Sequence, residues 1–217
     1  DAPLIICDAG YGLPRQARPR KEKISAISKQ LYNFIQWQMK NHDTKHQLAR
    51  IKVVGTSDVI CCVNERLLQL WDSSTLPKHV EFISQTLECL DLKEAVYLSP
   101  DATNTLDASK QPPRVTIVGL LIDRRIQPNR SMNRATSLDI TAARWPLEDF
   151  FSDIDSQEPL NVDTIMEGMQ EWYWNCSRGD MRNEECFVQA ATSAMERHAQ
   201  RHPNRPLHKV SKTSDET

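Results

Sequence analysis

An acidic residue, Asp123, follows an apolar segment and is the first candidate for a chemical role. The segment, residues 115–122, is apolar except for Thr116 and Gly119, which is typical of a strand buried on both faces of a parallel sheet. Gly119 is unusual there, since glycine weakens a strand unless something must come close to the backbone. Ligands of open α/β sheets bind outside the carboxyl ends of the strands. The glycine and the acid together therefore predict a small-molecule site.

The rest of the sequence predicts the elements that position this site. Apolar runs predict strands at residues 4–7, 51–54, 95–98, 115–122 and 141–144. Apolar positions spaced by three and four predict helices at residues 24–35, 131–138, 162–173 and 184–198. Residues 59–70 are expected to start extended and turn helical, and residues 80–89 to form a helix with or without a short strand. Residues 101–106 are expected to form a short helix. Residues 14–23 and 124–130 are expected to be loops. Strands that alternate with helices predict an α/β sheet domain.

Composition excludes several classes of protein. The 217 residues carry a formal net charge of −2, so the chain is no general polycation, and any nucleic-acid affinity has to come from local basic patches. No stretch reaches about 18 apolar residues, so no membrane span is predicted. The six cysteines have no CxxC spacing and the six histidines form no metal-ligand pair. We therefore predict no metal site, and we expect reduced, buried cysteines in a reducing compartment.

Three segments in a fixed order resemble one protein family. Residues 96–102 read VYLSPDA, with Asn104 two positions later, residues 117–123 read IVGLLID, and residues 142–147 read AARWPL. At similar separations, the tRNA position-nine purine methyltransferases of the SPOUT superfamily carry a YLSPDSxN-like segment, an IGGLVD-like strand and a TARLP-like strand. The resemblance covers roughly residues 4–174. It implies a mostly parallel sheet with helices on both faces and a C-terminal trefoil knot.

The resemblance also implies an activity and a division of the chain. Residues 1–178 would form the methyltransferase domain, and residues 179–217 a divergent C-terminal helix with a mobile polar tail. The domain would act as a monomer and transfer a methyl group from S-adenosylmethionine to ring nitrogen 1 of the purine at tRNA position 9, with guanine as the first choice and adenine as the other. The alternative is a catalytically inactive SPOUT domain that binds RNA or an assembly partner, which is favoured by Leu120 where the family has glycine. A dehydrogenase-type nucleotide fold is disfavoured because no GxGxxG follows a strand.

By resemblance, the cofactor would be held mainly by backbone groups. The residues carried over are Leu98, Ser99, Pro100, Gly119, Ala143, Trp145, Leu147, Leu160 and Val162. Ring nitrogen 1 of guanine carries a proton, so its methylation benefits from a carboxylate that accepts this proton. Asp123 is the first candidate for the general base and Asp163 the second. The alternatives are a solvated or turn-capping acid at Asp123 and a helix-capping acid at Asp163.

Basic side chains predict where tRNA would bind. The candidates for RNA contacts are Arg18, Arg20, Lys21, Arg124, Arg125, Arg130 and Arg134. A solvated basic loop is the alternative for the first three. The aromatic residues 172–174 are of the type that stacks on bases, but their position in a helix favours core packing.

Two features resemble the mitochondrial branch of the family. They are Asp163 and the pair Gln127 and Pro128 after the acid. Members of that branch work within a protein-only ribonuclease P complex. The likeness implies a protein partner in a ribonuclease P-like or other ribonucleoprotein complex, and a mitochondrial location, with the nucleus or cytoplasm as the alternative.

Overall fold

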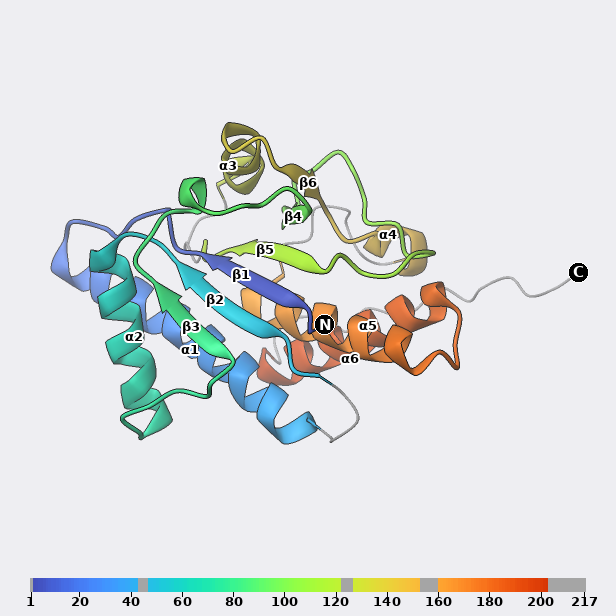
Figure 1. Cartoon of the computed structure of the whole chain (residues 1–217), viewed down its shortest axis with the longest axis horizontal. Coiled ribbons are helices and arrows are strands. Elements are labelled where there is room, and N and C mark those ends of the chain that lie inside the picture. Colours follow the sequence, from blue (N-terminus) through green and yellow to red (C-terminus); the bar gives the residue numbers. More distant parts are fainter. Residues whose placement is uncertain (1, 43–46, 122–126, 153–159, 203–217) are drawn as a thin grey trace, which may run out of the picture.

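The computed structural model describes residues 2–42, 47–121, 127–152 and 160–202, which form a parallel sheet covered by helices (Figure 1). The strands are β1 Leu4–Asp8, β2 Arg50–Val54, β3 Val80–Ile83, β4 Ala95–Leu98, β5 Val115–Gly119 and β6 Thr141–Ala143. The helices are α1 Ala17–Asn41, α2 Ser57–Trp71, α3 Arg130–Ser137, α4 Leu147–Phe150, α5 Val162–Arg178 and α6 Asn183–Arg201, and η1 Leu87–Cys89 is a 3-10 helix. None of the described helices combines the length and the apolar character needed to span a bilayer.

The six strands lie in the order β3-β2-β1-β5-β4-β6, and all neighbours are parallel. Asp8 at the end of β1 pairs with Val54 on one side and with Gly119 on the other. Leu98 at the end of β4 pairs with Val118 and with Ala143. The carboxyl ends of the strands therefore meet at one edge of the sheet. This arrangement confirms the predicted α/β fold class, and the trefoil knot stays a prediction.

The two faces of the sheet are covered unequally. Side chains such as Ile5 and Val53 point into the larger hydrophobic cluster, which they form with α1, α2, α5 and α6. Side chains such as Ile6 and Ile117 point to the other face and pack against η1 and Ala135 of α3. Figure 1 shows α3 on one side of the sheet and the four long helices on the other. Strands covered on both faces are expected to be continuous apolar runs, which is what the sequence contains.

The connections that follow β1 and β5 lead to opposite faces. β1 is followed by α1, on the face with four helices, whereas the next helix after β5 is α3, on the other face. Neighbouring parallel strands whose connections diverge in this way leave a crevice at their carboxyl ends, where open α/β sheets bind ligands. The fold therefore positions a candidate site beside Asp8 and Gly119.

Two predicted elements in the first third of the chain are wrong in part. Helix α1 begins at Ala17, so residues 17–23 of the predicted loop at residues 14–23 are helical. Alanine, arginine, lysine and glutamate, which make up most of residues 17–23, all have high helix propensity. Helix α2 is helical from Ser57 onward, because Val59 and Val63 are buried at helical spacing and this packing outweighs their β-branched preference.

Two segments beside the sheet also differ from prediction. Residues 80–89 contain strand β3 and the 3-10 helix η1 rather than an α-helix. Residues 101–106 form turns rather than a helix, because their backbone bonds to the segment after β6. Thr105 bridges Arg144, and the N–H of Leu106 donates to the Arg144 carbonyl at 2.8 Å.

Helix α6 shares its core with the helix before it. Phe187 and Ala190 are buried members of the larger hydrophobic cluster, together with residues of α5. The division after residue 178 stays a prediction, but side chains on both sides of it pack in one core. The predicted core packing of Trp172 and Trp174 is confirmed, since both are buried.

The cysteines only partly follow the expected burial. Cys7, Cys176 and Cys186 are buried free thiols, as predicted. Cys61 and Cys89 are exposed, so the prediction is wrong for these two. Cys61 lies on the outward face of α2. Its neighbours in the sequence are apolar, but adjacent residues of a helix point in different directions, so apolar neighbours do not imply a buried side chain.

Candidate active site at the carboxyl ends of the strands

Asp8 ends β1 and is fully buried at the carboxyl edge of the sheet. The N–H of Gly10 donates to its Oδ1 (2.8 Å), while the hydroxyl of Tyr97 (2.9 Å) and Nε of Arg134 (3.2 Å) donate to its Oδ2. The contact with Arg134 is an ion pair. A charge is tolerated in a protein interior only when it is paired and hydrogen-bonded, and these three donors meet that requirement.

Two further side chains connect this carboxylate to the surface. The hydroxyl oxygens of Tyr11 and Tyr97 lie 2.6 Å apart, and the guanidinium of Arg134 also binds Glu88, with Nη1 2.6 Å from Oε1. We call Asp8, Tyr11, Tyr97, Arg134 and Glu88 the Asp8 cluster. The cluster joins β1 and the residues after it to β4, η1 and α3.

Gly119 ends β5 directly beside the Asp8 cluster, earlier than the predicted strand end at residue 122. A Cβ atom at this position would lie 2.9 Å from the Tyr11 hydroxyl and 3.1 Å from the Tyr97 hydroxyl. Side-chain carbons do not pack this closely without displacing a neighbour. The glycine that stands out in the sequence therefore makes room for two phenols of the protein itself.

Burial and ion pairing set the protonation of the Asp8 cluster. Burial raises the pKa of Tyr11 to about 12 and also raises the pKa of Tyr97, so both are neutral phenols at physiological pH. The hydrogen bond from Arg134 holds the pKa of Glu88 at about 2. Burial acts to lower the pKa of Arg134, but Glu88 and Asp8 outweigh it and raise this pKa. The cluster thus holds one arginine cation between two carboxylates.

Most residues predicted to hold the cofactor lie in one hydrophobic cluster of the structure. Leu98, Ala143, Trp145, Leu147 and Val162 are buried members of the larger hydrophobic cluster, and Leu160 packs against it. They come from the ends of β4 and β6, from α4 and from the start of α5. Segments distant in the sequence are therefore brought together here, although their contact with a cofactor stays a prediction.

The side chain of Trp145 points into the core rather than towards the sheet edge. Its ring packs on Gly168 of α5 and lies edge-on to Phe187, with 5.8 Å between the ring centroids. Its Nε1 donates to the sulfur of Met169 (3.3 Å). A ligand at this position would therefore meet the backbone of Trp145 and not its indole.

Ser99 and Pro100 differ in exposure. Ser99 is buried, its hydroxyl lies 2.7 Å from that of Ser131, and its N–H donates to the carbonyl of Ala143 (3.0 Å). Pro100 is exposed. The polar groups of Ser99 thus connect the end of β4 to α3 and β6, and the contact of Pro100 with a cofactor stays a prediction.

Glu148 provides a buried acceptor next to these residues. It lies in α4, and its Oε1 forms an ion pair with Arg144. Its Oε2 is buried and has no hydrogen-bond partner within the part of the chain that the structure describes. A buried acceptor left unpaired costs free energy. This oxygen therefore fits a ligand that brings a donor, such as the amino or hydroxyl group of a nucleoside.

A cavity of about 260 Å³ is lined in part by residues of α4. It is lined by residues 105–109 together with Pro146, Asp149, Phe150 and Glu184. Small-molecule pockets usually measure about 300–1,000 Å³, so this cavity is slightly smaller than most. It adjoins the predicted cofactor loop through Pro146.

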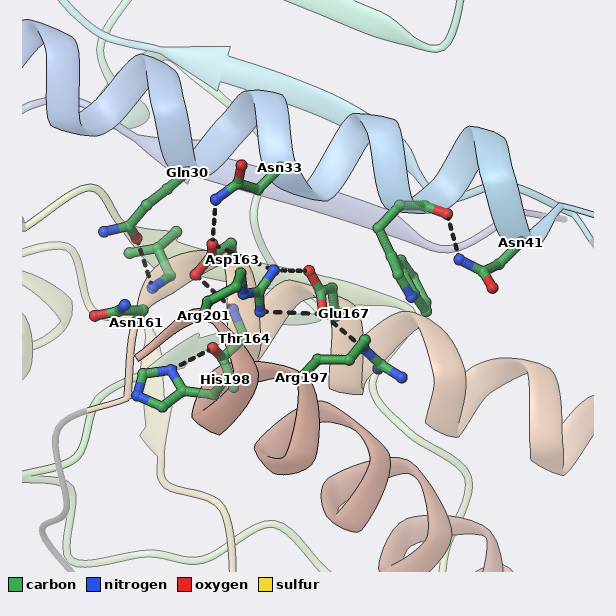
Figure 2. A network of polar contacts seen from close by, with 12 residues as sticks. Gln30, Asn33, Asn41, Asn161, Asp163, Thr164, Glu167, Arg197, His198 and Arg201 are labelled. Atoms are coloured by element: carbon green, nitrogen blue, oxygen red, sulfur yellow. Dashed lines mark hydrogen bonds and ion pairs between the residues drawn. The ribbon is translucent and has the colours of Figure 1, made fainter. Parts of the chain in front are cut away.

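Asp163, the second candidate for the general base, lies in a buried polar network between three helices (Figure 2). Asn33 of α1 donates to its Oδ2 (2.9 Å), and Nη1 of Arg201 of α6 lies 3.5 Å from the same oxygen. One turn further along α5, the fully buried Glu167 accepts hydrogen bonds from Arg197 (2.8 Å) and Arg201 (2.6 Å). These contacts connect α1, α5 and α6. The structure gives Asp163 a role in packing, and its catalytic role stays a prediction.

Three predicted RNA-binding residues lie in the first turns of α1 rather than in a loop. Arg18 pairs with Glu22 and Arg20 with Asp58, both at the surface, and Lys21 is exposed. Their charges are therefore presented by a helix. Contact with RNA stays a prediction for all three.

The other predicted basic residues surround the Asp8 cluster or lie outside the described residues. The guanidinium of Arg130 lies 5.3 Å from the ring centroid of Tyr11 and donates to the Tyr11 carbonyl (3.3 Å). Arg134 is bound by two carboxylates and belongs to the Asp8 cluster, so the structure gives it a partner inside the protein. Asp123, Arg124 and Arg125 lie outside the described residues.

Sequence reasoning missed the Asp8 cluster, although one signal for it was present. Asp8 follows an apolar strand and precedes Gly10, which resembles the combination of strand, glycine and acid that pointed to Asp123. The pairing of Asp8 with Tyr97 and Arg134 depends on strand register and on the position of α3, which spacing does not reveal. Among the described residues, no group of three or more histidines, cysteines, aspartates and glutamates could hold a metal ion.

Similar proteins were found by family and by fold. A family model described as tRNA (guanine(9)-N(1))-methyltransferase TRM10/TRM10A matches residues 20–179. No curated protein matches the chain. A crystal structure of full-length spTrm10 with SAH has 18% identity and a TM-score of 0.57, and the match covers 87% of this chain and 96% of that one.

Two more solved structures share the fold. The structure of spTrm10(74) has 16% identity and a TM-score of 0.59 over 86% of this chain and 92% of that one. A dual-specific Trm10 from Thermococcus kodakaraensis has 13% identity and a TM-score of 0.54 over 87% of this chain and 99% of that one. At these identities the likeness is one of fold.

Proposed function

Since the chain belongs to the tRNA (guanine(9)-N(1))-methyltransferase TRM10/TRM10A family, we propose that it transfers a methyl group from S-adenosylmethionine to ring nitrogen 1 of guanine 9 in tRNA. The family match carries this proposal, because residues 20–179 include every residue predicted to hold the cofactor and both candidate bases. A structural neighbour solved with SAH supports S-adenosylmethionine as the donor. The connections after β1 and β5 lead to opposite faces of the sheet, and this divergence supports a ligand site at the carboxyl edge.

The protein's main task in this reaction is positioning. S-adenosylmethionine supplies an electrophilic methyl group, and in-line transfer requires that the purine be held close to it in the correct orientation. The apolar residues at the ends of β4 and β6 would form one wall of the site, and Oε2 of Glu148 would accept a hydrogen bond from the nucleoside part of the cofactor. The target purine must be presented unstacked, because its ring edge is otherwise covered.

A carboxylate would remove the proton from ring nitrogen 1 of guanine. Asp123 is our first candidate for this base and Asp163 is the second. Asp123→Asn keeps the size of the side chain and removes the base, so we expect a loss of about 100-fold or more in kcat with guanine substrates. Asp163→Asn is the comparison, and an equal loss in both variants, without loss of fold, would contradict the assignment to Asp123 alone.

Methyl transfer to defined transcripts tests the function directly. The chain would be incubated with S-adenosylmethionine and tRNA transcripts that carry guanine, adenine or uracil at position 9, and the products identified as methylated nucleosides by mass spectrometry. We expect 1-methylguanosine from the guanine transcript and no product from the uracil transcript. Product from the adenine transcript would extend the activity to both purines. Cofactor and tRNA binding without any product would favour the alternative of a catalytically inactive SPOUT domain.

Calorimetric titration tests the cofactor site separately. We expect Glu148→Gln to weaken S-adenosylmethionine binding about tenfold, because the variant loses a charged acceptor. Glu184→Gln, in the wall of the neighbouring cavity, is the matched control and should bind as the unaltered chain does. Equal affinity in all three proteins would show that Glu148 does not contact the cofactor.

We also propose a protein partner and a mitochondrial location, on the likeness of Asp163, Gln127 and Pro128 to the mitochondrial branch. Affinity purification from fractionated cells would test both. Recovery of the protein in the mitochondrial fraction, together with subunits of a tRNA-processing complex, is the expected outcome. Recovery in the nuclear or cytoplasmic fraction without such subunits would contradict it.

A further inference from the structure

The hydroxyls of the Asp8 cluster form a chain with one direction. Asp8 is ion-paired with Arg134 and, as a carboxylate, only accepts hydrogen bonds. Tyr97 has a single hydroxyl hydrogen, which it donates to Asp8 over 2.9 Å. Tyr97 must therefore accept the hydrogen of Tyr11 across the 2.6 Å contact between them. The hydrogen of Tyr11 is thus committed, and its oxygen is left as an acceptor.

Tyr11 lies where a ligand of this sheet is expected. Its hydroxyl is packed beside Gly119, at the carboxyl ends of β1 and β5 where the connections diverge. The Arg130 guanidinium lies over the Tyr11 ring and donates to the Tyr11 carbonyl, which helps to hold the residue in place. The side chain is half-buried. No other donor reaches the Tyr11 oxygen from the described residues.

A fixed acceptor distinguishes guanine from its analogues. The edge of guanine that carries ring nitrogen 1 presents two donors, the N1–H and the exocyclic 2-amino group, whereas adenine has a C–H in place of the 2-amino group. The N1 proton must leave before nitrogen 1 can attack a methyl group. The 2-amino group is therefore the donor that persists from the bound substrate to the product.

We propose that the Tyr11 oxygen accepts a hydrogen bond from the 2-amino group of the target guanine, and that Asp8 and Tyr97 orient Tyr11 for this contact. Tyr11 is then a specificity residue and Tyr97 and Asp8 are positioning residues. The inference rests on the proposed function, because it takes the position-9 guanine as the substrate. Burial raises the pKa of both tyrosines. Both therefore keep their hydroxyl hydrogens between about pH 6 and pH 9, and the hydrogen bonds from Tyr11 to Tyr97 and from Tyr97 to Asp8 keep their direction.

Inosine provides the test, because it retains the N1–H of guanine and lacks the 2-amino group. The measurement is kcat/KM on tRNA transcripts with guanine or inosine at position 9. For the unaltered chain we expect a preference for guanine of about tenfold, the effect of one hydrogen bond to a specific acceptor. Tyr11→Phe should lower kcat/KM for guanine about tenfold, leave inosine unchanged, and so abolish the preference. Tyr32→Phe, which removes a hydroxyl from α1 far along the chain, is the matched control and should keep the preference.

Tyr97→Phe tests whether Tyr97 orients the Tyr11 hydroxyl. A purely structural role of Tyr97 would not predict a change in the preference for guanine over inosine. Without the Tyr97 oxygen, the Tyr11 hydroxyl can rotate and is no longer held as an acceptor, so the preference for guanine should shrink although Tyr11 is present. An equal loss of kcat/KM for guanine and inosine in both variants would overturn the proposal. Thermal melting of each variant separates this outcome from loss of fold.

The affinity of the same transcripts for the chain separates this inference from the proposed function. Binding is measured in the presence of SAH, which requires no chemistry. If the unaltered chain transfers no methyl group but binds the guanine transcript more tightly than the inosine transcript, and Tyr11→Phe removes this difference, the methyltransferase proposal fails and the inference stands. If neither turnover nor affinity distinguishes guanine from inosine in a Tyr11-dependent way, the inference is overturned.

Discussion

At the scale of single residues, Asp8 is a buried charge that depends on one cation. Arg134 is the only cation that the described residues place against it, and the arginine side chain is itself only 20% exposed. Removing one partner of a buried pair leaves an uncompensated charge. We expect Arg134→Met to lower the free energy of unfolding by about 2 to 4 kcal/mol, measured by urea denaturation.

The matched control for this substitution is Arg66→Met on α2. Arg66 bonds Gln69 at the surface, and the loss of an exposed contact of this kind costs about 0.5 kcal/mol or less. Similar losses of stability in the two variants would contradict the view that Asp8 needs Arg134. Because both residues are arginines and differ in burial and in ion pairing, the comparison measures what the two ion pairs of Arg134 contribute.

Glu88 makes the stability of the fold depend on pH at the acid end. Its pKa lies at about 2 in the folded protein, against an ordinary value of 4.5, because Arg134 donates a hydrogen bond to it. A lowered folded pKa stabilises the protein above the unfolded pKa, and the gain is lost as the pH falls from about 4.5 to about 2. We expect the stability difference between the unaltered chain and Glu88→Gln to shrink over this interval in urea titrations. A difference that stays constant from pH 5 to pH 2.5 would show that the ion pair does not stabilise the fold.

At the scale of elements, the close packing of α5 against the loop after β6 depends on one glycine. A Cβ at Gly168 would lie 2.8 Å from Cζ2 of the Trp145 indole, and another ring atom would be closer still. Alanine is normally better than glycine in a helix by about 1 kcal/mol, but overpacking a core costs about 1 to 3 kcal/mol. We expect Gly168→Ala to destabilise the fold by up to about 2 kcal/mol net and to weaken S-adenosylmethionine binding, since the clash displaces the predicted cofactor loop.

A second substitution provides the control. Trp145→Phe shortens the ring that the new methyl group meets, so Gly168→Ala should cost less in the Trp145→Phe background than alone. A double-mutant cycle of urea midpoints measures this coupling. Additive effects would mean that the two side chains do not meet in the folded protein.

At the scale of the whole molecule, buried strands were predictable and the contacts between distant segments were not. β1, β4 and β5 are largely apolar runs, because they lie inside the sheet and bury side chains on both of its faces. β3 lies at the edge of the sheet and is only partly buried, so its mixed pattern resembles that of an amphipathic helix. The apolar stripe of α1 predicts a helix, but its basic first turns carry no such stripe, so the sequence predicts a loop there.

The candidate site, too, contains a part that the sequence predicts and a part that it does not. The candidate cofactor residues are predicted from short segments that keep their order along the chain, and most of them lie in one hydrophobic cluster of the structure. The Asp8 cluster joins residues 89 and 126 positions apart, and no local pattern specifies which acid meets which arginine. Gly119 illustrates the limit. Its type predicted a close approach to the backbone, but the approaching groups are Tyr11 and Tyr97 of the same chain.

The largest prediction for the molecule concerns where the domain ends. Helix α6 places Phe187, Ala190 and Met195 in the core shared with α5, and its Arg197 and Arg201 balance the buried Glu167. A chain that ends at residue 178 loses both contributions. Each large apolar side chain contributes about 1.5 to 3 kcal/mol when buried, and the residues of α5 in the same cluster lose the side chains of α6 that they pack against.

The sum of these losses approaches the total stability of a typical domain, about 5 to 15 kcal/mol. We therefore expect residues 1–178 alone to lack a cooperative urea transition by circular dichroism. A chain that ends at residue 202 is the control, since it retains every contact described for α6, and its midpoint should match that of the unaltered chain. A cooperative transition of residues 1–178 at the original midpoint would restore the boundary expected from the family resemblance. It would also show that the core contacts of α6 attach a separate helix to a domain already complete.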